Sequence, residues 1–137
     1  CLDSILRQDY GDFELIVVDD GSPKSTRDMV MSYDDVRIRY HHISHGERSR
    51  ARNFGTDVAK GDYVCFVDDD DYLLENHLFD FFTFLEAQEF PNIIVRSGYY
   101  REMSGVRTPT INYLAKIHKN PVRFAAYNMC DLGTLCI

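Results

Sequence analysis

Two apolar segments of this chain each run into a cluster of acidic residues. Residues 15–18 (LIVV) precede Asp19 and Asp20, and residues 63–67 (YVCFV) precede four consecutive aspartates at 68–71. Short apolar runs rich in β-branched and aromatic residues predict buried strands of a parallel sheet that is covered on both faces. Ligands of open α/β sheets bind beyond the carboxyl ends of the strands. Both acidic clusters are therefore expected to face one crevice.

Helical patterns separate and follow these strands. Apolar residues at helical spacing predict helices at the amino terminus, after Pro23 with Ser25 as the N-cap, over 51–59 and over 75–89. The alternation at 36–40 predicts a half-exposed strand near a sheet edge, and 41–48 is predicted to be a polar loop. Strands that alternate with helices in this way indicate an α/β fold with a mainly parallel sheet flanked by helices.

Residues 92–96 predict another short strand, and the pattern weakens beyond residue 98. There we predict a hairpin or a long loop over 99–113 and a helix over 113–117. The four cysteines show no paired spacing that would indicate a metal site. The histidines at 41, 42 and 45 lie in the predicted polar loop, where no helix fixes their spacing, and are interpreted as part of that loop rather than as a metal site.

Composition excludes several classes of protein. The 137 residues suffice for one domain with one core, and the 45% hydrophobic content is that of a folded chain. The formal net charge of −7 argues against nucleic acid as a partner. No apolar stretch approaches the ~20 residues that a transmembrane helix needs. No signal peptide opens the chain, so a cytoplasmic location is the default expectation.

The acidic and basic clusters of the chain suggest binding of a divalent cation and of phosphate. Four neighbouring carboxylates repel one another, and Mg²⁺ or Mn²⁺ would compensate them, since hard cations take carboxylate oxygens. The alternative is a solvated acidic turn. Arg48, Arg50 and Arg52 stand at the start of the helix predicted near residue 51, where the backbone already favours anions. Arginine adds paired donors for phosphate oxygens, and the alternative is a solvated basic face.

The order and spacing of three motifs resemble the nucleotide-sugar-binding half of the family 2 glycosyltransferases, which have the GT-A fold. The matching pieces are 16–22 (IVVDDGS), 51–55 (ARNFG) and 59–71 (AKGDYVCFVDDDD). Residues 1–10 also resemble the first helix of that family and the turn after it. The likeness runs from residue 1 to about residue 74. The resemblance implies a GT-A-like sheet and one partial domain over 1–137, with 1–97 as the nucleotide-sugar-binding part and 98–137 as the start of the acceptor side.

The resemblance also implies roles for the matched residues. Asp20, or else Asp19, would hydrogen-bond the nucleotide base, and Arg52 would lie close to the nucleotide. The aspartates at 68–71 would contain the D-x-D motif of the family. In it Asp68 lies near the ribose and assists the metal, Asp69 fills the variable place, Asp70 ligates the metal, and Asp71 is the acidic residue that often follows.

The implied reaction is metal-dependent transfer of a sugar from a nucleoside diphosphate sugar, with UDP favoured, to an acceptor hydroxyl with inversion. Acceptors in this family are saccharides, lipid-linked sugars or proteins, its products include polysaccharides, and several members work at the inner face of a membrane. A sugar-phosphate nucleotidyltransferase is one alternative. A truncated nucleotide- or cation-binding domain without turnover is another.

The chain departs from the family pattern at both ends. The first strand of the family, with its proline-containing nucleotide loop, would precede Cys1, and the acceptor-binding half would follow Ile137. We therefore expect a fragment. Asp131 and Glu102 are the late carboxylates that could act as the catalytic base, but neither lies in a recognisable motif. The base itself is expected to lie outside the chain.

Overall fold

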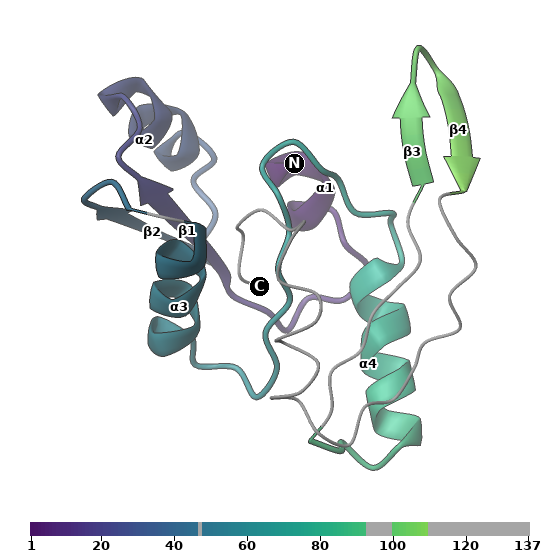
Figure 1. Cartoon of the computed structure of the whole chain (residues 1–137). Helices are drawn as coiled ribbons and strands as arrows, with labels where there is room; N and C mark the ends of the chain where they lie inside the picture. Colours follow the sequence, from purple (N-terminus) through teal and green to yellow (C-terminus); the bar gives the residue numbers. More distant parts are fainter. Residues whose placement is uncertain (47, 93–99, 110–137) are drawn as a thin grey trace. The chain divides into compact units, whose positions relative to one another are not determined.

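The first compact part of the chain contains a parallel pair of strands, β1 (Leu15–Asp20) and β2 (Ile38–Ile43) (Figure 1). The computed structural model describes residues 1–46, 48–92 and 100–109. The strands pair in register from Leu15 opposite Ile38 to Asp20 opposite Ile43. The helix α2 (Lys24–Met31) lies on the connection between them, as a parallel crossover requires. The predicted α/β fold with a parallel sheet is confirmed.

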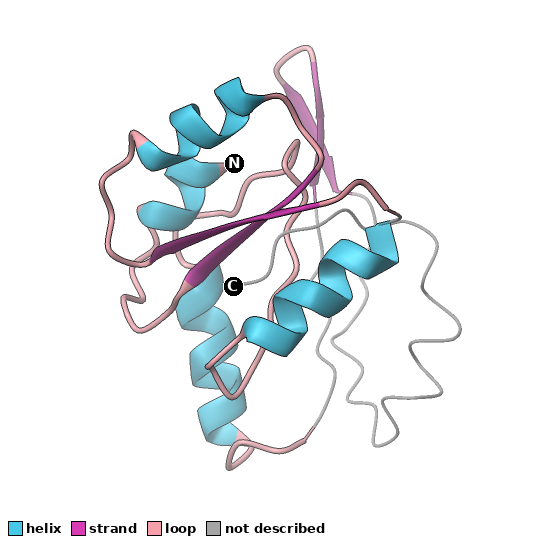
Figure 2. Cartoon of the chain, turned by 90° about the vertical axis from the view of Figure 1, so that its left-hand side faces the viewer, coloured by secondary structure: helices cyan, strands magenta, loops and turns pink. Residues whose placement is uncertain are grey.

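Helices cover both faces of this strand pair (Figure 2). Side chains alternate along a strand, and residues in register share a face. Val17 and Asp19 therefore face the same side as Tyr40 and His42, and α2 packs on this side of β2. The next residues along each strand face the other side, where α3 (Arg48–Val58) packs against β1. Adjacent residues at the end of β1 thus enter different environments.

The core gathers around the amino-terminal half of β1. Leu15 packs with Ile5 of α1 (Leu2–Leu6) and with Val67 in one buried cluster. Complete burial of a leucine or isoleucine side chain contributes about 2 kcal/mol to folding. The segment before the acidic residues 68–71 is therefore anchored beside β1.

The prediction of a strand over 63–67 is wrong, because the segment does not form the hydrogen bonds of a continuous strand. Only Phe66 forms an isolated bridge, and the rest of the segment is irregular. The described residues supply no continuous ladder for it, so Val67 is fixed by packing instead of by pairing. Cys65 lies partly buried beside the same cluster, and burial raises the pKa of its thiol to about 11.

Two other boundaries differ from the sequence predictions. Pro23, with φ −58° and ψ 152°, precedes the first residue of α2, so Ser25 lies inside the helix and is not its N-cap. Proline holds a φ that suits the entry to a helix, and this outweighs the preference of serine for the cap. His41 and His42 belong to β2 and not to a loop, because the strand continues to Ile43.

The carboxyl end of the acidic segment leads into α4 (His77–Ala87), which was predicted over 75–89. Gln8 joins α1 to this region. Its side-chain oxygen accepts a hydrogen bond from the Leu78 amide, and its side-chain nitrogen donates to the Leu74 carbonyl. The ring of Tyr10 stacks on Phe82 with centroids 4.9 Å apart. None of the described helices is both long enough and apolar enough to cross a membrane.

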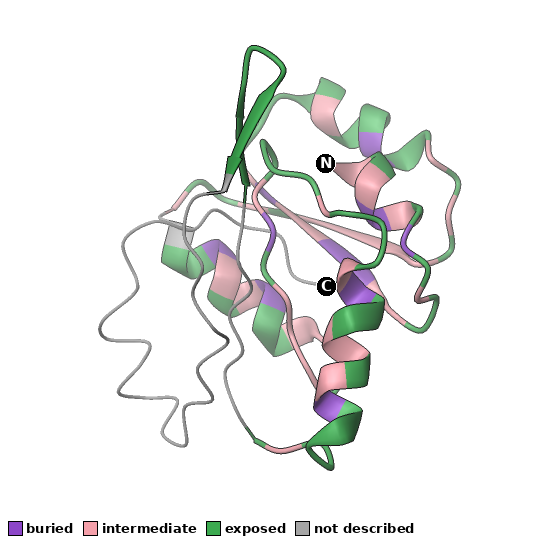
Figure 3. Ribbon diagram, turned by 90° about the vertical axis from the view of Figure 1, so that its right-hand side faces the viewer, coloured by how far each residue is buried: buried purple, intermediate pink, exposed green. Residues whose placement is uncertain are grey.

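The chain divides into two compact units, and the boundary falls after Phe84 within α4. In the second unit the described residues include a hairpin of β3 (Tyr100–Met103) and β4 (Val106–Pro109). Ser104 and Gly105 both have positive φ, which suits a tight hairpin turn. The hairpin was one of two structures predicted here, and it is exposed along its length (Figure 3). The strand predicted over 92–96, apart from its first residue, and the helix predicted over 113–117 lie outside the described residues.

Candidate functional site

Asp19 is a buried carboxylate that the protein itself satisfies. It is 5% exposed, it accepts hydrogen bonds from the Tyr40 hydroxyl and from the Ser22 amide (2.6 Å), and His42 Nδ1 lies 3.5 Å from its Oδ2. Burial alone would raise the pKa of Asp19, but these hydrogen bonds outweigh it, and the pKa lies below its usual value. Burial and the bond to Asp19 raise the pKa of Tyr40 to about 12. Asp19 therefore ties β1, β2 and the turn after β1 together.

Asp20 has a different environment on the other face of the strand pair. Its Oδ1 accepts a hydrogen bond from the Gly46 amide at 2.8 Å, and its side chain is 23% exposed. The Nδ1 atom of His45 lies 2.9 Å from the Asp20 carbonyl oxygen and 3.5 Å from its Oδ2. This carboxylate is held by a loop backbone and remains open to solvent, which suits a ligand contact.

The helix α3 carries the arginines predicted to bind phosphate. Ala51 is buried against the rest of the unit, which sets the rotation of the helix. Arg52 Nη2 lies 4.0 Å from Asp68 Oδ1, and both side chains are partly exposed, at 18% and 20%. Arg50 donates to the Ser44 carbonyl at 3.2 Å. The side chain of Arg48 lies outside the described residues.

Residues 68–71 form a turn, here called the acidic turn, in which the Asp71 amide donates to the Asp68 carbonyl at 3.1 Å. The Oδ1 atom of Asp68 is buried and has no hydrogen-bond partner among the described residues. The guanidinium of Arg52 is close to it but beyond hydrogen-bond distance. Asp69 and Asp70 are exposed. Burial, followed by the charges of Asp68 and Asp70, raises the pKa of Asp71 above its usual value. The turn thus concentrates negative charge, and Arg52 is the cation that the structure places beside Asp68.

Contacts with α1 hold the acidic turn in place. The thiol of Cys1 donates to the Asp68 carbonyl at 3.2 Å, and the Leu73 amide donates to Ser4 Oγ at 3.0 Å. Val67 fixes the residue before the turn in the core. The backbone of the turn is therefore anchored at both ends, while the side chains of Asp69 and Asp70 stay exposed.

The amino-terminal part of α3 connects the two acidic clusters. Asp20 contacts Gly46, just before the helix, and Asp68 contacts Arg52 in the second turn of the helix. At about 1.5 Å of rise per residue, the first residue of the helix and Arg52 are separated by ~6 Å along the axis. The structure thus brings Asp20, Arg52 and Asp68 to one region and leaves Asp19 on the other side of β1.

The acidic turn fits a divalent cation when part of the coordination comes from a ligand. The described residues contain no group of three or more His, Cys, Asp or Glu side chains arranged to hold a metal ion by themselves. Mg²⁺, however, is usually held by one or two carboxylates together with substrate phosphates and water. The buried, unpartnered oxygen of Asp68 and the exposed carboxylate of Asp70 suit that mode of binding.

Sequence reasoning missed several residues that shape the site. Tyr40 and His42 satisfy Asp19, His45 contacts Asp20, and Glu14 accepts hydrogen bonds from Arg39 and from the Lys60 amide. These contacts join residues 21 to 46 positions apart, so no local pattern marks them. The only local signal was the polar character of 41–48.

Of the two carboxylates near the carboxyl terminus that were predicted as possible bases, the structure describes only Glu102. Glu102 lies on β3 in the second unit and forms an ion pair with Arg107 at 2.8 Å. Asp131 lies outside the described residues. The catalytic base therefore stays unassigned.

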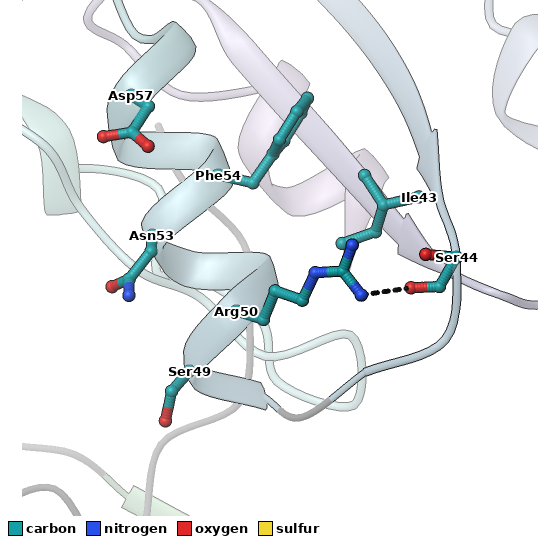
Figure 4. A pocket seen from close by; sticks show the side chains of 7 residues that line it. All are labelled: Ile43, Ser44, Ser49, Arg50, Asn53, Phe54 and Asp57. Carbon is teal, nitrogen blue, oxygen red and sulfur yellow. Dashed lines mark hydrogen bonds between the residues drawn. The ribbon is translucent and has the colours of Figure 1, made fainter.

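Two hollows lie beside the strand pair. A groove of about 690 Å³ runs between the end of β2 and α3 and is crossed by Arg50 (Figure 4). Arg50 lines it, but Asp20, Arg52 and the acidic turn do not. A second hollow of about 570 Å³ is lined on the α2 side by Asp19, Tyr40 and His42 among others. Neither hollow contains the acidic turn, so the candidate site is defined by its charges and contacts and not by an enclosed cavity.

Comparison with known proteins shows which family the chain matches. The family model described as glycosyl transferase family 2 matches residues 1–136. The chain is 41% identical over 110 residues to the uncharacterized glycosyltransferase EpsJ of Bacillus subtilis, a match that covers 79% of this chain and 31% of EpsJ.

Two further relatives show the same relationship. The chain is 35% identical over 103 residues to glycosyltransferase GlyG of Streptococcus pneumoniae, covering 73% of this chain and 34% of GlyG. It is 32% identical over 123 residues to an Escherichia coli protein, covering 85% of this chain and 48% of the relative. That protein is named UDP-Glc:alpha-D-GlcNAc-diphosphoundecaprenol beta-1,3-glucosyltransferase WfaP. The chain thus spans between about a third and a half of the length of these relatives.

Proposed function

This chain belongs to glycosyl transferase family 2, and we propose that it binds a nucleoside diphosphate sugar at Asp20, Arg52 and the acidic turn. The sugar is then transferred to an acceptor hydroxyl. The observation that carries this proposal is the buried, unpartnered Oδ1 of Asp68, 4.0 Å from the guanidinium of Arg52. A buried carboxylate oxygen without a hydrogen bond is costly, so a ligand that supplies a donor or a cation would stabilise it.

Each of the proposed site residues contacts a different part of the nucleoside diphosphate sugar. Asp20 presents an acceptor for an N–H group of the base, because its carboxylate is held by the Gly46 amide and still reaches solvent. Arg52 lies where its guanidinium supports the nucleotide, at the amino-terminal part of a helix whose dipole favours anions. Asp68 and Asp69 lie on the ribose side of the acidic turn. In this assignment Asp19 supports the strand end from behind and does not touch the nucleotide.

Asp70 and Asp68 would hold a divalent cation, either Mg²⁺ or Mn²⁺, together with the diphosphate of the donor. When bound, the cation neutralises the charge that grows on the leaving diphosphate. Burial, followed by the charges of Asp68 and Asp70, raises the pKa of Asp71, so a cation here would also relieve the repulsion between these carboxylates. Binding of the cation and of the diphosphate should therefore be coupled.

The reaction breaks the bond between the anomeric carbon and the diphosphate oxygen and forms one to the acceptor oxygen. The electron pair leaves with the diphosphate, and the acceptor proton passes to a carboxylate base that lies beyond the described residues. Attack from the side opposite the leaving group inverts the anomeric centre.

The relatives guide the choice of substrates. The name of WfaP specifies UDP-Glc as donor and a GlcNAc-diphosphoundecaprenol acceptor, and another relative is named poly(ribitol-phosphate) beta-glucosyltransferase. We therefore favour a UDP-sugar donor and a lipid-linked or polymeric acceptor. An acceptor anchored in lipid would place the reaction at the inner face of a membrane.

Calorimetric titration of UDP, GDP and CMP with Mn²⁺ and with EDTA tests the proposal. We expect UDP to bind in Mn²⁺ and the binding to be lost in EDTA. Asp68→Asn should abolish this dependence, whereas Asp62→Asn, which removes an exposed carboxylate outside the acidic turn, should not. Equal affinity for UDP in Mn²⁺ and in EDTA would contradict the proposed site.

A further inference from the structure

We propose that His45 is a positioning residue for the nucleotide, because its ring and the following Gly46 amide hold the carboxylate of Asp20 in one orientation. The inference rests on the proposed role of Asp20 in nucleotide binding. His45 was interpreted from the sequence as part of a solvated loop, and its side chain is 84% exposed. Its contacts nevertheless all concern one residue of the candidate site.

The hydrogen on the ring of His45 can be assigned from its neighbours. Nδ1 lies 2.9 Å from the Asp20 carbonyl oxygen and 3.5 Å from Asp20 Oδ2. Both oxygens are acceptors, so Nδ1 must carry a hydrogen for the contact to be favourable. The ring therefore donates to the backbone of Asp20 and brings a positive N–H dipole to its carboxylate.

The backbone of His45 passes close to the turn after β1, which places its ring beside Asp20. Gly21 has φ +87°, and a Cβ atom there would lie 2.9 Å from His45 Cβ and 3.3 Å from its Cα. A Cβ atom on Gly46 would lie 2.8 Å from Cδ of Arg50. The two glycines thus let the loop pass closely between the end of β1 and the start of α3. This close passage brings the Gly46 amide to within 2.8 Å of Asp20 Oδ1.

The consequence is that each carboxylate oxygen of Asp20 has its own neighbour. Oδ1 accepts from Gly46, and Oδ2 lies beside His45 Nδ1. A carboxylate at a strand end would otherwise rotate, and a base could bind only to the fraction of molecules with the right orientation. His45 removes this cost without touching the nucleotide itself.

The experiment compares His45→Ala, His45→Asn and His45→Gln in the full chain. The side-chain nitrogen of asparagine can take the place of Nδ1, whereas that of glutamine lies further out. Loss of one neutral hydrogen bond corresponds to about a fivefold effect. In His45→Ala we expect amide hydrogen exchange at Gly46 to become about fivefold faster and the Kd for UDP in Mn²⁺ to rise by a similar factor. His45→Asn should restore both values, and His45→Gln should not.

A double-mutant comparison tests whether His45 acts through Asp20. In an Asp20→Ala background, His45→Ala should weaken UDP binding no further, and an additive loss would overturn the proposal. Unchanged Gly46 exchange in His45→Ala, or failure of His45→Asn to restore it, would overturn the positioning role alone. Absence of UDP binding by the wild-type chain, or no effect of Asp20→Ala, would overturn the proposed function of Asp20 and this inference with it.

Discussion

The end of β1 and the acidic turn both place carboxylates after an apolar segment, but their charges are met in different ways. At the end of β1, Asp19 accepts hydrogen bonds from Tyr40 and Ser22, and Asp20 accepts one from Gly46. In the acidic turn, Asp68 Oδ1 has no hydrogen-bond partner among the described residues, and burial together with the neighbouring charges raises the pKa of Asp71.

This difference separates two uses of the same sequence pattern. Carboxylates that accept hydrogen bonds from the protein stabilise the backbone around them, so their removal should lower the free energy of unfolding. Carboxylates that repel one another destabilise the free protein. A cation that binds between them removes this repulsion and so stabilises the folded state. The predictions below test this division, beginning with the largest expected effect.

Asp70→Ala should weaken Mn²⁺-dependent UDP binding by about 100-fold, equivalent to ~2.7 kcal/mol, because it removes a proposed metal ligand. Calorimetry measures the affinity. The thermal unfolding midpoint of the free protein should not fall, since the Asp70 side chain is exposed. An unaltered affinity would show that the acidic turn is only a solvated turn.

Asp19→Ala should lower the free energy of unfolding by about 3 kcal/mol, because the Tyr40 hydroxyl and the Ser22 amide lose a buried acceptor. Asp20→Ala should lower it by about 1 kcal/mol or less, since its carboxylate reaches solvent. Urea unfolding of both variants compares the two neighbours directly. Equal losses would remove the distinction between the two faces of β1.

Arg52→Ala should weaken UDP binding about tenfold, because it removes the guanidinium beside Asp68. Arg50→Ala is the matched control, since Arg50 lies on the same helix and is exposed with a bond to the Ser44 carbonyl. Its effect should stay below about twofold. If both variants bound UDP equally weakly, the effect would come from the general positive charge of the helix.

Glu14 extends the comparison to the residue before β1. Burial would raise its pKa, but hydrogen bonds from Arg39 and the Lys60 amide outweigh it, so the pKa lies below its usual value in the folded state. Its contribution to stability is therefore present above the pKa of the unfolded chain and is lost as pH falls through the lower folded pKa. Glu14→Gln should reduce the loss of stability between pH 5 and pH 3 by about 1 kcal/mol. Urea unfolding at several pH values measures it, and identical pH profiles would contradict the prediction.

Asp71→Asn should give the smallest effect, a gain of about 0.3 kcal/mol in unfolding free energy at pH 7 without metal. The folded state raises the pKa of Asp71, so its ionised form costs stability above that pKa, and the cost disappears as pH falls. The gain should vanish in acid. A loss of stability at pH 7 would mean that the carboxylate makes a favourable contact.

Local patterns predicted most of the elements of the first unit. Continuous apolar residues indicated β1, and helical spacing indicated α3 and α4. The segment 63–67 was misread because its composition is that of a strand, while a ladder depends on a partner at the right distance. The start of α2 was misplaced because the fixed φ of Pro23 prevailed over the capping preference of Ser25.

The sequence by itself determined that acidic residues follow two apolar segments and that arginines begin a helix between them, because each pattern is local. Only the tertiary structure decided which aspartate is structural and which is open to a ligand. Asp19 and Asp20 are adjacent and chemically identical, and strand alternation sends them to opposite faces. Asp19 accepts a hydrogen bond from Tyr40, 21 positions away, and Asp20 accepts one from Gly46, 26 positions away. The register of β1 with β2 and the packing of α3 bring these two partners into place.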